Sequence, residues 1–311
     1  MKKLLKLIGY TLLTILALLV ILFAVFFQRD RTVEELKPLY TNASSAFMPL
    51  MGMQVHYRDE GNKADTTPLL LIHGMSSSLN TFDSVALLLR EQRRVISIDM
   101  PAFGLTGPNP ENKYSFTYYS QFLDSFLTRL GVPVCDIAGN SLGGGIAWQF
   151  TTAHPEKVRK LILIDASGYP VKNARGSLGF KIATTPVINN LMLYITPKAL
   201  VRKSLEGIYY NKNIVTEAQV TRFHDVAISQ GNRKAFMSIM KNGFEQEPEK
   251  ISTIHKPTLI IWGEKDGLIP VENAYLFQKN IKGSKLVVLN GVGHVPMEEA
   301  PQKTAMIIAG F

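Results

Sequence analysis

The chain has 311 residues, of which 46% are hydrophobic and 19% are charged, so it can bury a large core. Its net charge is +9, but the lysines and arginines are scattered and form no stripe with aromatic residues, which argues against a nucleic-acid partner. The single cysteine, Cys135, excludes a disulfide within the chain, and no cluster of metal-ligating residues is evident. We therefore expect no cofactor and no metal.

An uncharged apolar run from Leu7 to Phe27 follows three lysines. It is long enough to cross a hydrocarbon core of about 30 Å at about 1.5 Å per residue. The alternative is a cleaved signal peptide, but the run exceeds the usual apolar region of about 7–15 residues, and residues 25–30 lack a small-x-small cleavage site. We expect residues 1–27 to be an uncleaved single-pass anchor. The lysines favour a cytoplasmic N-terminus and an extracytoplasmic main domain, although basic residues after the run weaken that bias.

Residues 28–47 are polar and are interpreted as a linker. From residue 48 onward, short β-rich apolar runs alternate with helical segments, which is typical of a parallel sheet with helices on both faces. Over residues 168–250 the strand signals stop while the helical ones continue. The pattern therefore predicts a core of residues 48–167 and 251–311 and a helical unit of residues 168–250.

The most informative stretch is Gly139-Asn140-Ser141-Leu142-Gly143, directly after the apolar run Val134 to Ala138. A small-x-Ser-x-small pattern after a strand is typical of a nucleophile elbow, a sharp turn that lifts the serine hydroxyl out of the sheet. Glycine is needed on either side because a Cβ there would collide with the neighbouring turn. Ser141 is thus the candidate nucleophile, although an ordinary glycine-rich turn has the same pattern.

A nucleophilic serine needs a base, and the base needs an acid that fixes its tautomer. Asp266 follows the predicted strand Thr258 to Trp262, and His294 follows the predicted strand Lys285 to Leu289. Both side chains therefore lie past the carboxyl ends of strands, the edge at which open α/β sheets bind ligands. The chain order Ser141, Asp266, His294 predicts a catalytic triad.

Other side chains compete for these roles. Asp99 and Asp165 each follow a predicted strand and are alternatives for the acid, and His73 is the alternative base. We favour Asp266 because a Gly-x-x-Asp loop one element before the histidine is the commoner arrangement.

Together these residues resemble the serine hydrolases of the α/β-hydrolase fold, from about Met48 to the C-terminus. Further matching motifs follow predicted strands or helices: His73-Gly74, Asp99-Met100-Pro101-Ala102-Phe103-Gly104, Ala153-His154-Pro155 and Gly293-His294. The resemblance implies a mostly parallel eight-stranded sheet flanked by helices, with residues 168–250 as a helical cap. It also implies an oxyanion hole made by the backbone N–H groups of Met75 and Leu142, with His73 shaping that loop.

The nucleophile narrows the function that the resemblance implies. A serine at the elbow favours hydrolysis of carboxylic esters through an acyl-enzyme, whereas dehalogenases and epoxide hydrolases of this fold use a carboxylate there. The membrane anchor and the apolar residues from Phe180 to Leu193 favour a lipid-like substrate, such as a monoacylglycerol or another medium-chain acyl ester. Those apolar residues alternatively serve to pack the cap onto the core. No obligate protein partner is evident.

Two alternatives remain. Carbon–carbon bond hydrolases of the meta-cleavage type share the Gly-Asn-Ser-x-Gly-Gly pattern found at residues 139–144. The Met75-Ser76-Ser77-Ser78 segment and Val295 depart from their usual pattern and favour an esterase or lipase. The more remote alternative is a non-catalytic receptor or interaction module, because a fold does not determine a function.

Overall fold

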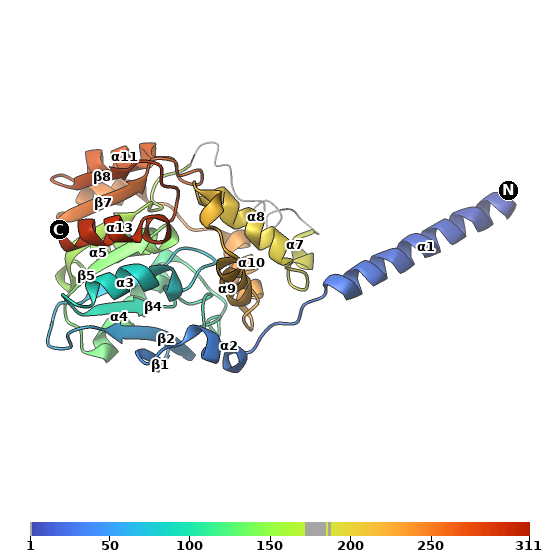
Figure 1. Cartoon of the computed structure of the whole chain (residues 1–311), viewed down its shortest axis with the longest axis horizontal. Coiled ribbons are helices and arrows are strands. Elements are labelled where there is room, and N and C mark those ends of the chain that lie inside the picture. Colours follow the sequence, from blue (N-terminus) through green and yellow to red (C-terminus); the bar gives the residue numbers. More distant parts are fainter. Residues whose placement is uncertain (1, 172–184, 186–187) are drawn as a thin grey trace.

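The computed structural model describes residues 2–171, 185 and 188–311 (Figure 1). Within them, eight strands form one sheet in the order β1-β2-β4-β3-β5-β6-β7-β8. Strand β2 pairs antiparallel with β1 and β4, and all other neighbours pair in parallel. This confirms the predicted mostly parallel eight-stranded sheet. The strands are β1 (Ser45–Leu50), β2 (Met53–Glu60), β3 (Leu69–Ile72), β4 (Val95–Ile98), β5 (Cys135–Asn140), β6 (Val158–Ile164), β7 (Thr258–Gly263) and β8 (Lys285–Leu289).

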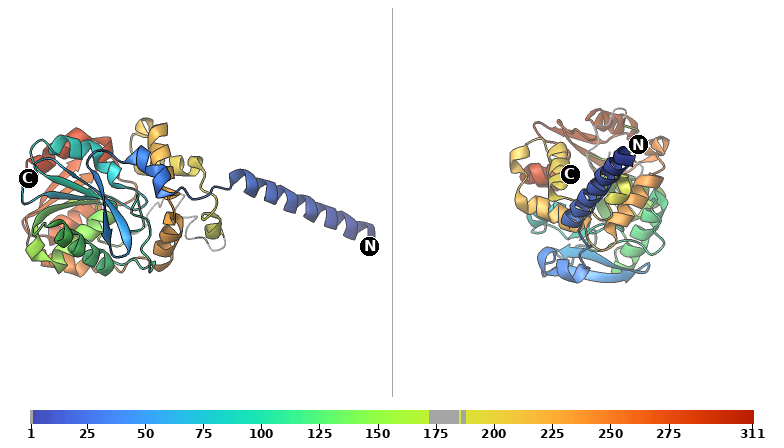
Figure 2. Two further views of the ribbon diagram at one scale, coloured as in Figure 1. Left: turned by 90° about the horizontal axis from the view of Figure 1, so that it is seen from below. Right: turned by 90° about the vertical axis from the view of Figure 1, so that its right-hand side faces the viewer.

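Helices cover both faces of the sheet (Figure 2). In β3 the side chains alternate between two core clusters: Leu70 and Ile72 pack on the face of α4, α5 and α11, and Leu69 and Leu71 pack on the face of α3 and α13. All four are fully buried, as a central strand between two helical layers requires. The covering helices are α3 (Asp83–Leu89), α4 (Phe116–Leu130), α5 (Leu142–Ala153), α11 (Glu272–Asn280), α12 (Pro296–Glu299) and α13 (Pro301–Ala309). Short 3₁₀ helices are η1 (Leu79–Phe82), η2 (Pro155–Lys157), η3 (Lys212–Ile214) and η4 (Pro248–Thr253).

Between β6 and β7, the described residues form four helices, here called the cap helices, which lie at one end of the sheet (Figure 1). The third of them starts at a capping box, in which Thr216 and Gln219 each accept a hydrogen bond from the other's backbone N–H group. Part of the predicted apolar stretch, residues 180–184 and 186–187, lies outside the described residues. The cap helices are α7 (Ile188–Leu191), α8 (Lys198–Ile208), α9 (Glu217–Ala227) and α10 (Asn232–Asn242).

The N-terminal helix α1 (Lys2–Phe26) leaves the body on the side of the cap helices (Figures 1 and 2). The side chains that the structure describes in this helix are exposed, and its most apolar 18-residue window has a mean hydropathy of 2.7. Among the described residues, α1 is the one helix that is long and apolar enough to cross a membrane. Helix α2 (Val33–Tyr40) follows, in residues expected to be a linker, and β1 already begins at Ser45. A capping box between Thr32 and Glu35 explains the start of α2.

Candidate active site

Ser141 lies at the turn between β5 and α5 with φ +56° and ψ −119°, a strained conformation for a residue with a Cβ. The neighbouring glycines allow the turn. A Cβ on Gly139 would lie 2.1 Å from the carbonyl oxygen of Gly143, and one on Gly143 would lie 2.3 Å from that of Ile72. The segment therefore has the backbone geometry that the elbow motif predicts, and it holds Ser141 at the carboxyl edge of the sheet.

His294 and Asp266 meet at the same edge. The Nδ1 atom of His294 lies 2.7 Å from Oδ2 of Asp266, and both side chains are almost completely buried. The other carboxylate oxygen, Oδ1, accepts hydrogen bonds from the N–H groups of Leu268 at 2.8 Å and Ile269 at 3.0 Å. Because Nδ1 is engaged by the carboxylate, Nε2 is the ring nitrogen that remains to take a proton. Ser141 and His294 line the same cavity.

Asn140 joins the elbow to the histidine loop and was not singled out from the sequence. Its Nδ2 group donates hydrogen bonds to the carbonyl oxygens of His294 at 3.0 Å and Ile164 at 3.2 Å. The residue before the candidate nucleophile thus fixes the backbone of the candidate base. The position of Asn140 inside the Gly-Asn-Ser pattern was the sequence signal that could have indicated its importance. That pattern does not show that the side chain binds the backbone of a distant loop.

Asp165, the alternative acid, also lies in this cluster. A carboxylate oxygen of Asp165, a carboxylate oxygen of Asp266 and a ring nitrogen of His294 all lie within 4.8 Å of one another, so the three groups have a spacing that could hold a metal ion. Oδ1 of Asp165 accepts a hydrogen bond from the N–H of Gly263 at 2.9 Å. Burial, and then the negative charge of Asp266, raise the pKa of Asp165 well above its usual value. We interpret Asp165 as a neutral carboxylic acid that lies beside the pair formed by Asp266 and His294.

His73 and Asp99 do not line the cavity. Nδ1 of His73 lies 2.7 Å from the carbonyl oxygen of Gly74, and Nε2 accepts a hydrogen bond from the N–H of Met100 at 3.1 Å. Burial lowers the pKa of His73, which agrees with a neutral ring. Asp99 binds Nδ1 of His56 at 2.7 Å. Both alternatives therefore hold loops together behind the cavity.

The two predicted oxyanion donors lie next to the elbow. Leu142 is the first residue of α5, so its N–H has no partner within the helix. Met75 lines the cavity, and Gly74 passes so near the elbow that a Cβ on it would lie 3.2 Å from Cβ of Ser141. Within the described part of the chain, neither N–H group has a hydrogen-bond partner. Both groups are thus free to bind an oxygen near Ser141.

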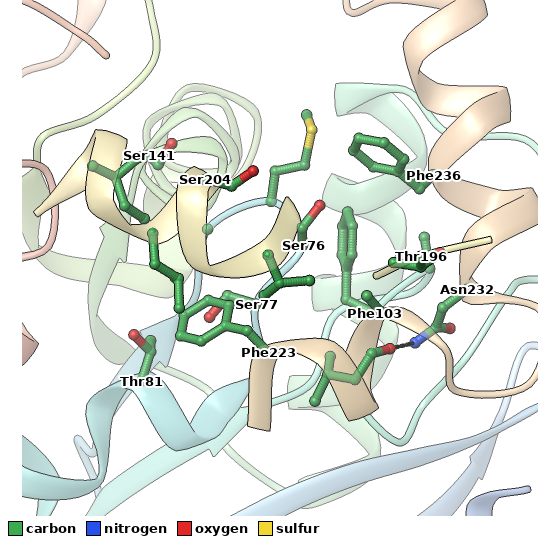
Figure 3. Close-up of a pocket in the computed structure, with 18 of the residues that line it drawn as sticks. Ser76, Ser77, Thr81, Phe103, Ser141, Thr196, Ser204, Phe223, Asn232 and Phe236 are labelled. Atoms are coloured by element: carbon green, nitrogen blue, oxygen red, sulfur yellow. Dashed lines mark hydrogen bonds between the residues drawn. The ribbon is translucent and has the colours of Figure 1, made fainter. Parts of the chain in front are cut away.

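A cavity of about 180 Å³ extends from Ser141 between the core and the cap helices (Figure 3). In the view of Figure 3, the rings of Phe103 and Phe223 lie between Ser141 on one side and Asn232 on the other. Apolar side chains of the cap helices form much of the wall: Leu200, Val201, Leu205, Ile208, Phe223, Val226, Phe236 and Met237. The cavity therefore reaches Ser141 and has a mostly apolar wall on the side of the cap helices.

Two adjacent glutamates, which the sequence did not reveal as important, fasten the cap helices to the histidine loop. Glu299 accepts hydrogen bonds from the N–H groups of Gly293 at 2.8 Å and Tyr210 at 3.0 Å. Glu298 binds Arg222 of α9 at 2.6 Å. The N–H of His294 itself donates to the carbonyl oxygen at the end of α8, Ile208, at 2.8 Å. The candidate base is thus held from the cap side as well as by Asp266.

Residues 67–301 match the family model of the alpha/beta hydrolase fold, so the chain belongs to the α/β-hydrolase-fold family, a family of hydrolases. Lipase 1 of Psychrobacter immobilis is 27% identical over 282 residues, which cover 90% of this chain and 84% of that protein. The 2-hydroxymuconate semialdehyde hydrolase of Pseudomonas putida is 26% identical over 269 residues, 84% of this chain and 91% of that protein. The crystal structure of a bacterial membrane phospholipase A superposes with a TM-score of 0.74 at 23% identity, covering 100% of this chain and 99% of that one.

Proposed function

We propose that the protein is a serine hydrolase that cleaves carboxylic esters through an acyl-enzyme on Ser141. One observation carries the proposal: the strained elbow serine shares its cavity with His294, whose Nδ1 lies 2.7 Å from the buried carboxylate of Asp266. This arrangement supplies a nucleophile, a base and a group that stabilises the charged base.

In the proposed reaction, Oγ of Ser141 attacks the ester carbonyl while its proton passes to Nε2 of His294. Asp266 stabilises the resulting imidazolium, and the N–H groups of Met75 and Leu142 bind the oxyanion, each contributing about 3 kcal/mol to the barrier reduction. The C–O bond then breaks, and the imidazolium returns its proton to the leaving alcohol. Water, activated by the same base, releases the carboxylic acid and restores Ser141.

We infer that the substrate is lipid-like, such as a monoacylglycerol or a medium-chain acyl ester. The apolar wall of the cavity supports this inference, and so does the likeness to a lipase. The alternative, a carbon–carbon bond hydrolase of the meta-cleavage type, is supported by the likeness to a hydrolase of 2-hydroxymuconate semialdehyde. Arg233 lines the cavity; its Nε and Nη2 groups bind Asp30, but its Nη1 group has no hydrogen-bond partner among the described residues, so this arginine does not decide between the two substrates.

We further propose that α1 is an uncleaved membrane anchor, with the hydrolase domain on the extracytoplasmic side. Residues 48–167 and 251–311 then form the catalytic core, and residues 168–250 form a cap that shapes the substrate pocket. The exposed apolar surface of α1 supports the anchor, because a soluble environment would leave it unpartnered.

The substrate class can be tested with the full chain in detergent micelles and a series of chromogenic esters from acetate to dodecanoate, with Ser141→Ala as the blank. We expect kcat/KM to rise by up to about fourfold per methylene over the first few added carbons, the effect of about 0.8 kcal/mol per buried CH₂. A preference for acetate would contradict a lipid-like substrate. Cleavage of a meta-cleavage diketone without cleavage of any ester would favour the alternative function.

A further inference from the structure

Residues Gln28–Tyr40, here called the strap, connect α1 to the core and lie along the cap helices. The backbone of Arg31 forms a parallel bridge with Ser229: its N–H donates to the carbonyl oxygen of Ile228 at 2.8 Å, and its carbonyl oxygen accepts from the N–H of Gln230 at 2.9 Å. The strap is therefore paired, through its backbone, with the turn between α9 and α10. The two segments are about 200 residues apart in the sequence.

Asp30 of the strap binds the residues at the start of α10. The residue at the N-cap position of α10 is Gly231, with φ +83°, and it has no side chain to bind the first N–H groups of the helix. Oδ2 of Asp30 accepts a hydrogen bond from the N–H of Gly231 at 3.0 Å, and Oδ1 accepts from Nε and Nη2 of Arg233 at 2.9 and 2.6 Å. A carboxylate at this position also interacts favourably with the helix dipole.

A second set of contacts holds the end of α9. The buried carboxylate of Asp225 binds Nη1 of Arg31 at 2.7 Å and the hydroxyl of Tyr40 at 2.8 Å. In addition, Nε2 of His224 lies 3.2 Å from the side-chain oxygen of Gln28. The strap thus fastens both sides of the α9–α10 turn.

The elements that the strap fastens are walls of the cavity. Cavity-lining residues occur on both sides of the turn and along α10: Val226, Ala227, Asn232, Arg233, Phe236 and Met237. Asp30 does not line the cavity, so it can influence a substrate only through these residues.

The end of α1 contacts a further part of the wall. The N–H of Gln28 donates to the carbonyl oxygen of Tyr194 at 2.8 Å, and the ring of Phe27 stacks on that of Tyr194 with centroids 6.4 Å apart. Met192 and Thr196, two residues to either side of Tyr194, line the cavity. The exit of α1 is therefore joined to the same pocket wall as the strap.

We propose that the strap is a positioning part of the substrate pocket and that Asp30 determines acyl-chain specificity by holding the N-terminus of α10. The proposal rests on the ester hydrolysis proposed above. In this proposal, the strap supports the wall of the substrate pocket. The strap has no role in the chemical steps at Ser141.

The test is Asp30→Asn in the full chain, assayed in detergent micelles. We expect KM for a medium-chain ester to rise about 2- to 30-fold, the usual range for a residue that acts through others. The value of kcat, the hydrolysis of the acetate ester and the rate of labelling of Ser141 by a fluorophosphonate should stay unchanged. Asp30→Glu, which keeps the carboxylate, should restore part of the lost specificity.

The matched control is Asp59→Asn, which breaks a two-bond Arg–Asp pair in the core: Oδ1 and Oδ2 of Asp59 accept from Nε and Nη2 of Arg94, both at 2.9 Å. This variant should keep the wild-type ratio of medium-chain to acetate KM, even where its Tm falls. If Asp30→Asn does not fold, Tyr40→Phe, which removes the hydroxyl bound to Asp225, should shift the ratio in the same direction.

Wild-type chain-length specificity in folded Asp30→Asn, or in Tyr40→Phe if the first variant fails to fold, would overturn the strap proposal alone. An equal shift in Asp59→Asn would also overturn it, because the effect would then follow from lost stability. If the wild-type chain hydrolysed no ester, the proposed function would fail and the strap proposal with it.

Discussion

At the scale of single residues, the candidate site contains two neighbouring buried carboxyl groups, Asp165 and Asp266, that have different partners. Asp266 bonds to Nδ1 of His294 and accepts hydrogen bonds from two backbone N–H groups. Asp165 is completely buried and accepts a hydrogen bond from the N–H of Gly263. Burial, and then the charge of Asp266, raise the pKa of Asp165, and a proton on Asp165 avoids two adjacent negative charges in this buried cluster.

Replacement of Asp165 by Asn should therefore change how stability depends on pH. The pKa of Asp165 is raised in the folded chain, so above about pH 4, its unfolded value, the unfolded chain releases this proton while the folded chain holds it. The free energy of unfolding consequently falls as the pH rises toward the folded pKa. We expect Asp165→Asn to lack this decline, so that its Tm relative to wild type increases between pH 4.5 and 8. A Tm difference independent of pH would contradict the assignment.

At the scale of elements, the cap helices are joined to the core next to the candidate base. Glu298 of α12 accepts from the hydroxyl of Tyr209, after α8, at 2.8 Å and from Arg222 of α9 at 2.6 Å, and it also binds Thr81 of η1. Its side chain is 7% exposed and that of Arg222 is 18% exposed. A single carboxylate thus connects two cap helices and the core. Because the effective dielectric around these largely buried groups is low, a charged group left without its partner there would reduce the stability of the fold.

Glu298→Ala should leave the guanidinium of Arg222 without its partner and destabilise the protein by about 3 kcal/mol. The measurement is denaturant unfolding of the full chain in detergent. Glu91→Ala is the control, because Glu91 is 77% exposed in its pair with Arg90 and such pairs contribute at most about 1 kcal/mol. Equal losses in the two variants would show that Glu298 does not fasten the cap helices.

At the scale of the whole molecule, α1, the strap, the cap helices and the core form one connected series. Helix α1 extends away from the body next to the cap helices, and the cavity lies between those helices and the core (Figures 1 and 3). The proposed anchor would therefore hold the cap side of the molecule near the membrane. For the proposed hydrolysis of lipid-like esters, this position would shorten the path from the membrane to Ser141.

An anchor and a signal peptide differ in whether residues 1–27 remain on the mature protein. We expect the protein to stay in the membrane fraction after an alkaline carbonate wash, because an apolar helix of this length binds the bilayer nearly irreversibly. Intact mass spectrometry of the purified protein should then give the unprocessed chain. A mature, water-soluble protein that lacks these residues would contradict the anchor.

Much of the fold follows from local patterns in the sequence. The parallel sheet was predictable because its apolar strands alternate with helices, and the elbow because glycines flank Ser141 where a Cβ would collide. The pairing of Asp266 with His294 followed from both side chains lying past strand ends. That contact is present at 2.7 Å, while the catalytic roles themselves stay predictions.

The remaining features depend on contacts between distant segments. The Thr32-x-x-Glu35 capping box was readable, but it lies in a polar stretch that was interpreted as a linker. The bond of Asp30 to Arg233 spans 203 positions, and nothing near Asp30 in the sequence indicates that partner. The raised pKa of Asp165 likewise depends on its burial beside Asp266, which only the assembled sheet brings about.

The central claim is that Ser141 is the nucleophile of an ester hydrolase. Its most direct test is intact mass spectrometry and peptide mapping of the full chain after treatment with a fluorophosphonate. We expect one adduct on wild type, located on Ser141, with loss of ester hydrolysis, and we expect Ser141→Ala to be unlabelled and at least about 10⁴-fold less active. A folded wild-type protein that takes up no label, or a Ser141→Ala variant that hydrolyses esters at the wild-type rate, would contradict the account.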